Sequence, residues 1–192
     1  MASSKALASK AQTIATYIDG QVIDEPDRVA VCVKGMVEGF PATMEAIYPN
    51  WPFGVVYTIE TNPVTDPGNQ APPQAYAQLT VYPRVGRGVA SFFTRLLLFE
   101  SAGMSIGEKR LERVLNVSYD DRTVAERFVH YPGVTDNLLN LESVAKFSEL
   151  IVRFGVGIYL AQPKSFNALD YDVARNTFAT LGLLGRALNE AF

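Results

Sequence analysis

Cysteine and histidine, which build most metal centres and many hydrolytic active sites, are scarce in this chain. Its 192 residues include one of each. Cys32 has no second cysteine to pair with, so an intrachain disulfide is excluded. Zinc and iron sites need several Cys, His or carboxylate ligands, and we therefore predict neither a metal nor another cofactor. The apolar neighbours Val31 and Val33 predict that Cys32 is a buried, unreactive thiol within a strand.

Long apolar runs and a large excess of one charge are also missing. The longest apolar stretches, 96–99 and 156–161, are far shorter than the ~20 residues that cross a bilayer. Lys5 and Lys10 interrupt the N-terminal segment, which is atypical of a secretory signal. The net charge of −3 gives no electrostatic reason to bind nucleic acid or an anionic membrane. We expect a cytoplasmic protein without a membrane span and without a nucleic-acid partner.

The length and composition that are present suit one globular domain. A chain of 192 residues with 48% hydrophobic residues can bury a core without a disulfide or a metal. Within the single domain 1–192 we distinguish an N-terminal helix (1–20), a β-rich half (28–100) and a mixed half (103–192).

The periodicity of the first part predicts one helix followed by strands. Apolar residues recur at helical spacing over 4–19 and stop at Gly20. Alternation then predicts strands, with a bend at Gly35 to Gly39 and a long exposed connection at 62–74. The predicted strands are 29–33, 41–47, 53–61, 75–82 and 94–99.

The second half mixes the two periodicities. We predict a short charged helix over 106–114, a strand over 115–119, and a helix over 121–131 that Asp121 caps. The remaining elements are a helix over 134–141, a hairpin turning near Gly155, and a long helix capped by Asn167 and running to Glu190. Because strands and helices do not alternate regularly, we predict an α+β fold. It has an antiparallel sheet of five to eight strands, an N-terminal helix, a central helical pair and a long C-terminal helix.

Two arginines mark the strongest candidate for an anion contact. In Arg84-Val85-Gly86-Arg87-Gly88 the glycines free the backbone, and the guanidinium groups of Arg84 and Arg87 can bind phosphate or carboxylate. The segment lacks the spacing of a nucleotide-binding loop, so a plain turn is the alternative.

Three further residues stand out. His130 ends a predicted helix, where a histidine can lie beside the terminal carbonyls. Trp51, among Tyr48, Pro49, Pro52 and Phe53, forms either an aromatic platform for a ligand or a plug at the end of the sheet. Charged residues between Glu108 and Arg113 are expected on a solvated helix face.

The second half also resembles a family of uncharacterised bacterial domains of unknown function. The similarity covers about residues 103–163 and is carried by five runs: Gly103 to Glu108, Leu115 to Asp121, Val124 to Phe128, Asn137 to Leu139 and Gly157 to Pro163. These positions determine fold, and the resemblance implies no enzymatic activity. Some members of that family carry the domain after membrane helices, and no membrane role is transferred to this chain.

The sequence therefore favours a non-enzymatic domain that binds a protein or a small ligand through its sheet or through a cleft under its helices. The first alternative is an enzyme that uses Arg84, Arg87, Asp121 and His130. The second is a carrier of an apolar small molecule, for which eleven phenylalanines would suit a cavity. The N-terminal helix has a narrow apolar seam of Leu7, Ala11, Ile14 and Ile18, which leaves two outcomes open. One is a homodimer formed through this helix or through a sheet edge, and the other is a monomer in which the helix packs across the sheet.

Overall fold

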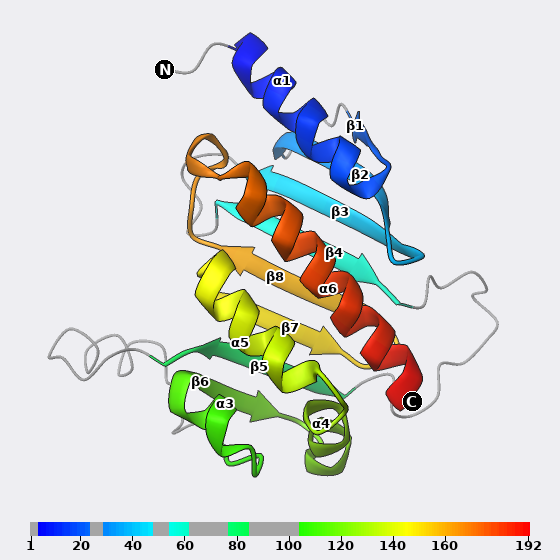
Figure 1. Ribbon diagram of the computed structural model, residues 1–192, viewed down its shortest axis with the longest axis vertical. Helices are drawn as coiled ribbons and strands as arrows, with labels where there is room; N and C mark the ends of the chain where they lie inside the picture. Colours follow the sequence, from blue (N-terminus) through cyan, green and yellow to red (C-terminus); the bar gives the residue numbers. More distant parts are fainter. Residues whose placement is uncertain (1–3, 24–28, 48–53, 62–76, 85–103) are drawn as a thin grey trace, which may run out of the picture.

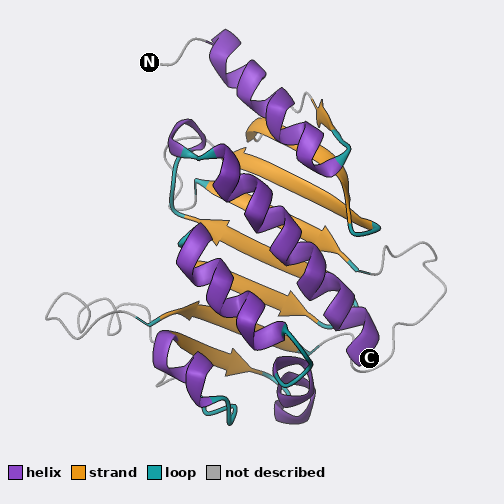
Figure 2. Ribbon diagram, viewed as in Figure 1, coloured by secondary structure: helices purple, strands orange, loops and turns teal. Residues whose placement is uncertain are grey.

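A computed structural model describes residues 4–23, 29–47, 54–61, 77–84 and 104–192. These residues form one eight-stranded antiparallel sheet with helices packed on one side (Figures 1 and 2). The predicted α+β fold is confirmed, including its N-terminal helix, its central helices and its long C-terminal helix.

The strands are ordered β1-β2-β3-β4-β8-β7-β5-β6 across the sheet, and each neighbouring pair is antiparallel. The first four follow the chain, whereas β4 pairs with β8 from the far end of the sequence, so the two halves share one sheet. Their bounds are β1 Gln21–Ile23, β2 Val29–Val37, β3 Phe40–Ile47, β4 Val55–Glu60, β5 Gln78–Pro83, β6 Leu115–Tyr119, β7 Glu149–Arg153 and β8 Gly157–Gln162.

The longest helix, α6, lies obliquely over the middle of the sheet with α5 beside it (Figure 1). It contacts β2, β3, β4 and β8 and thereby covers strands from both halves of the chain. The helical segments are α1 Ser4–Ala15, η1 Thr16–Ile18, α3 Lys109–Val114, α4 Arg122–Val129, α5 Val134–Ala145, η3 Phe166–Ala168 and α6 Tyr171–Ala191.

The start of the last helix was predicted wrongly. Asn167 lies inside the short 3-10 turn η3, and α6 begins at Tyr171 with Asp170 as its N-cap. The Asp170 carboxylate accepts hydrogen bonds from the backbone N–H groups of Asp172 and Val173. The buried side chains of Phe166 and Leu169 explain the separate turn, because they anchor the chain before the helix starts.

The bend expected over Gly35 to Gly39 lies at the end of that range, because β2 runs through Gly35 to Val37 and the turn follows at Glu38 and Gly39. A Cβ at Gly35 would overlap the carbonyl oxygen of Ile18 and the Cα of Gly20. Gly35 therefore serves close packing of the α1–β1 connection on the strand, a requirement set by tertiary structure.

Two other differences concern extent. The three-residue strand β1 was not predicted, and α5 continues to Ala145 rather than ending at 141. The predicted strand at 94–99 and the connection at 62–74 lie outside the described residues.

The core lies between the sheet and the helices. Residues that alternate along the strands, such as Val55, Tyr57 and Ile59 of β4, point toward the helices and are fully buried. Tyr57 packs edge-on against Phe178 of α6, with ring centroids 5.1 Å apart, and Phe128 of α4 packs likewise against Phe154 at 5.8 Å. These aromatic pairs lie between the sheet and the helices, which is the region where an apolar ligand was considered.

The N-terminal helix α1 packs on its own chain, against β1, β2 and α6. Ala11, Ile14 and Ile18 of the predicted seam have at most 1% of their surface exposed, and Leu7, its fourth member, is partly buried against the same core. Lys10 of α1 also contacts the turn η3 that precedes α6, because its ammonium group donates a hydrogen bond to the Asn167 carbonyl at 3.1 Å.

Candidate functional site

The sheet face opposite the helices carries a row of side chains from one edge toward the other. Strand register aligns Lys34, Thr43, Thr58, Tyr159, Ile151, Thr80 and Ser118, each opposite the next. Residues of this row are half-buried or exposed, whereas the adjacent residues on the helix side are buried. We call this row and its neighbours Val56, Ala161 and Tyr82 the open face, because no helix among the described residues covers it, although Cys32 on the same face is fully buried.

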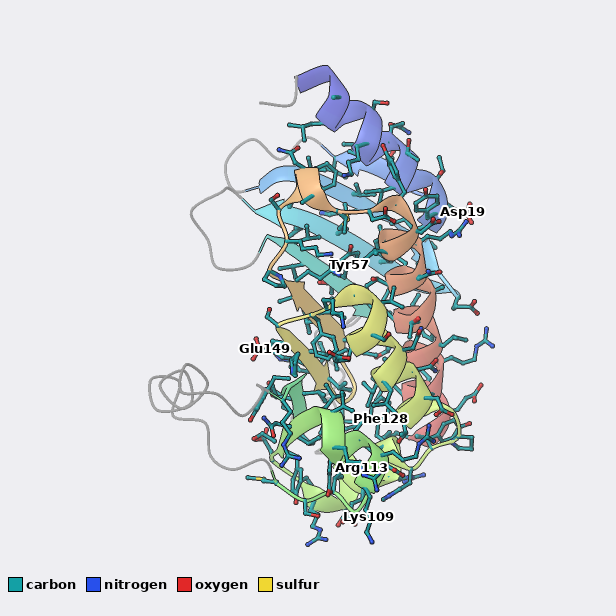
Figure 3. The ribbon with its side chains drawn as sticks, turned by 60° about the vertical axis from the view of Figure 1, so that its left-hand side comes forward. Asp19, Tyr57, Lys109, Arg113, Phe128 and Glu149 are labelled. Atoms are coloured by element: carbon teal, nitrogen blue, oxygen red, sulfur yellow. The ribbon has the colours of Figure 1, made fainter. Side chains whose placement is uncertain are left out.

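Charges surround the middle of the open face. Glu45 and Glu149 lie toward one end of their strands, and Glu60 and Arg153 lie toward the other. Figure 3 shows Glu149 on the side of the sheet away from the helices and Tyr57 on the inner side. A weakly charged centre with a charged periphery is the arrangement found in protein interfaces.

Tyr159 is the aromatic side chain at the centre of the row, and its position is held by neighbours. The Arg153 guanidinium carbon lies 5.2 Å from the centroid of the Tyr159 ring, in cation–π geometry. Gln78 accepts a hydrogen bond from Arg153 Nε at 3.4 Å and donates to the Thr80 hydroxyl at 3.0 Å. These contacts link β8, β7 and β5 on the same face.

A second feature lies where β5 ends beside α3. The exposed Arg84 donates from Nη1 to the backbone carbonyl of Glu112 at 2.7 Å. The Glu112 carboxylate in turn accepts three hydrogen bonds through Oε1: from the Ser105 hydroxyl at 3.0 Å, the Ile106 N–H at 2.7 Å and the Gly107 N–H at 2.9 Å. The carboxylate thus occupies the backbone donors that an external anion would need.

The surroundings of Glu112 favour its ionised form. Chiefly the hydrogen bond from Ile106 N–H lowers the pKa of Glu112, with further contributions from Ser105, Gly107 and the Arg84 guanidinium. Glu112 is therefore a structural carboxylate, since a general base at neutral pH needs a pKa near 7 and an available lone pair.

His130 and Asp121 do not converge on one reactive centre. His130 is the exposed C-cap of α4, as its position before Tyr131-Pro132-Gly133 suggested, and Asp121 caps the other end. The eight-residue helix separates these two caps by about 13 Å. Gly107 lies near His130, since a Cβ at Gly107 would be 3.8 Å from the ring atom Cε1. His130 therefore lies beside Gly107, whereas Arg84 bonds the carbonyl of Glu112.

Asp121 is an N-cap, as predicted, because its carboxylate accepts the Val124 N–H at 3.1 Å. Trp51 and Arg87 lie outside the described residues, and so do the glycines that follow Arg84. Among the described residues, no group of three or more His, Cys, Asp or Glu side chains is placed to bind a metal ion.

Sequence reasoning missed the open face and the role of Glu112. Alternation around Tyr159 and Thr58 does show which residues share one side of each strand, but not that β4 and β8 are neighbours. Glu112 was expected on a solvated helix face, and its partners depend on a turn at Gly107 with φ +81°. Only the glycine itself signals that turn in the sequence.

No helix in the described ranges is long and apolar enough to cross a bilayer. Comparison with family models, with curated proteins and with solved structures finds no match to this chain.

Proposed function

We propose that this protein is a non-enzymatic binding domain whose open face contacts a protein or an extended peptide. The observation that carries the proposal is the row of half-buried hydroxyl, aromatic and aliphatic side chains on a sheet whose other face is covered by helices. Tyr159 and Ile151 supply apolar contact area, and the threonines supply hydrogen-bonding groups at little cost in side-chain entropy.

Charge favours a protein over an anionic partner. Lys34 and Arg153 on this face are accompanied by Glu45, Glu60 and Glu149, so their positive charge is offset. Nucleic acid and anionic membranes select surfaces with clustered lysine and arginine. The enzyme alternative has less support, because Asp121 caps one end of α4 and His130 lies at the other end of that helix.

Site-specific photo-crosslinking in cells that produce the protein tests this proposal. A photoreactive amino acid at Thr58 or Ile151 is expected to yield a discrete adduct of higher mass. The same group at Arg175 or Ala179, which are exposed on α6, is the matched control and is expected to yield none. Adducts from α6 alone, or from neither face, would contradict the proposal.

Association into a homodimer and a cytoplasmic location are further parts of the proposal. The seam of α1 is already buried, so a dimer of the native chain would use another surface. In the described part of the sheet, β1 is an edge strand with only three residues. A single cysteine that is buried, Cys32, suits a reducing compartment.

A further inference from the structure

The second edge of the described sheet, β6, is shielded by a segment of its own chain. Met104 N–H donates to the carbonyl of Val117 in β6 at 2.8 Å, and the Tyr119 hydroxyl donates to the Ser105 carbonyl at 3.1 Å. Ile106 follows with its side chain fully buried in the core. We call residues 104–107 the edge guard.

The hydrogen bond to Val117 shows which backbone groups of β6 face away from β5. These are the groups that the edge guard bonds and that another strand would otherwise bond. In an antiparallel strand the N–H and C=O of one residue point to the same side and those of the next residue to the other. Because Val117 C=O points outward, the backbone groups of Tyr119 and the Leu115 C=O also face outward, whereas the Leu115 N–H already donates to the Leu111 carbonyl of α3. An uncovered edge of this kind is a template for another strand.

Among the described residues, Glu112 accepts most of the hydrogen bonds that hold the edge guard in place. Its single oxygen Oε1 accepts hydrogen bonds from three consecutive residues of the guard, Ser105, Ile106 and Gly107. Hydrogen bonds to a charged group are stronger than those between neutral groups, although water weakens them at an exposed site. Loss of this one carboxylate therefore weakens the hold on the whole segment.

The strand beneath the guard is complementary to itself. If two copies of Leu115–Tyr119 pair antiparallel about Val117, Leu115 lies opposite Tyr119 on the helix side. Asn116 then lies opposite Ser118 on the other side, and no like charges meet. Such a pair would extend the sheet symmetrically from one copy to the other.

We propose that the edge guard keeps β6 from pairing with β6 of a second copy of this chain, and that Glu112 holds the guard in place. Release of the guard converts β6 into a self-association edge. The inference concerns the rim of the sheet and does not depend on the function of the open face.

The test uses the full chain and two substitutions at one position. Glu112→Ala removes the acceptor, whereas Glu112→Gln keeps an oxygen acceptor without the charge. Amide hydrogen exchange at Met104, Ile106 and Gly107 is expected to be about 10- to 100-fold faster in Glu112→Ala and less affected in Glu112→Gln. Sedimentation equilibrium is expected to show dimers that increase in the order native, Glu112→Gln, Glu112→Ala.

A third change locates the contact. Asn116→Lys with Ser118→Lys, added to Glu112→Ala, places ammonium groups opposite each other in the proposed pair and is expected to restore the native mass. If circular dichroism shows that Glu112→Ala does not fold, hydrogen exchange and sedimentation equilibrium are measured on Glu112→Gln at high concentration instead. Unchanged exchange, an unchanged mass, or dimers that the two lysines do not dissociate would each overturn the proposal.

Discussion

At the scale of single residues, Tyr57 is the most unusual side chain of the core. It is fully buried beneath α6, and no hydrogen-bond partner of its hydroxyl lies among the described residues. A buried polar group without a partner costs free energy, about 1–3 kcal/mol. The ring itself is well packed against Phe178. We therefore expect the ring to stabilise the native state and the unpaired hydroxyl to destabilise it.

Tyr57→Phe is therefore expected to raise the free energy of unfolding by about 1 kcal/mol at neutral pH, because the ring stays and the unpaired hydroxyl goes. Urea denaturation measures the change. Tyr159→Phe, a tyrosine on the open face, is the matched control and is expected to change stability by less than about 0.5 kcal/mol. A loss of stability in Tyr57→Phe would show that the hydroxyl has a partner.

The effect of Tyr57→Phe on the free energy of unfolding also depends on pH. Burial raises the pKa of Tyr57 above its ordinary value of about 10. Above that pH the unfolded chain loses the proton while the native one keeps it, so stability falls as pH rises through about 10. Tyr57→Phe is expected to remove this contribution, giving a shallower alkaline loss of stability than in the native chain.

At the scale of elements, local signals in the sequence identified some local contacts and missed others, since the Asp170 cap of α6 was not predicted although its partners lie two and three residues away. Asp121 was identified as a cap because its partner, Val124 N–H, lies three residues away. The seam of α1 was identified because helical spacing alone brings Ile14 and Ile18 to one side. The packing role of Gly35 was not predicted, because the group that requires a glycine there, the Ile18 carbonyl, approaches from another element.

The candidate site illustrates the same limit. Arg84 and His130 were chosen for their chemistry, yet the 105–107 turn and Glu112 decide what surrounds them. The row through Thr58 and Tyr159 depends on the β4–β8 pairing, which joins strands from opposite halves of the chain. No periodicity within either strand encodes that pairing.

The cap at Asp121 allows a matched test on one element. Asp121→Ala is expected to lower the free energy of unfolding by about 1 kcal/mol, because the Val124 N–H loses its acceptor. Asp120→Ala, the exposed neighbour outside the cap, controls for loss of charge and is expected to be nearly neutral. Urea denaturation compares the two, and equal losses would contradict the capping role.

At the scale of the whole molecule, the sheet and α6 join both halves of the chain. α6 contacts β2 and β3 from the first half and β8 and α5 from the second. A core shared in this way has no internal boundary at which one half can unfold alone. We therefore expect a single cooperative transition.

Two distant core substitutions test this expectation. Ile14→Ala in α1 and Leu138→Ala in α5 both remove a fully buried side chain, and each is expected to cost about 2–5 kcal/mol. In both variants, far-ultraviolet and near-ultraviolet circular dichroism should report the same lowered midpoint. A transition that splits in two in Ile14→Ala would show that the α1 region unfolds independently.

The β4–β8 pairing also has a consequence for biosynthesis. The ribosome synthesises β4 long before β8 and α6. Until residues 157–191 have been made, one edge of β4 has no partner strand and the apolar side chains of Val55 and Ile59 are not covered by α6. Pairings between distant segments form slowly and leave strand edges exposed in the interval. We therefore expect wrong strand pairing, and a need for chaperones, to be greatest while only the first half of the chain has been made.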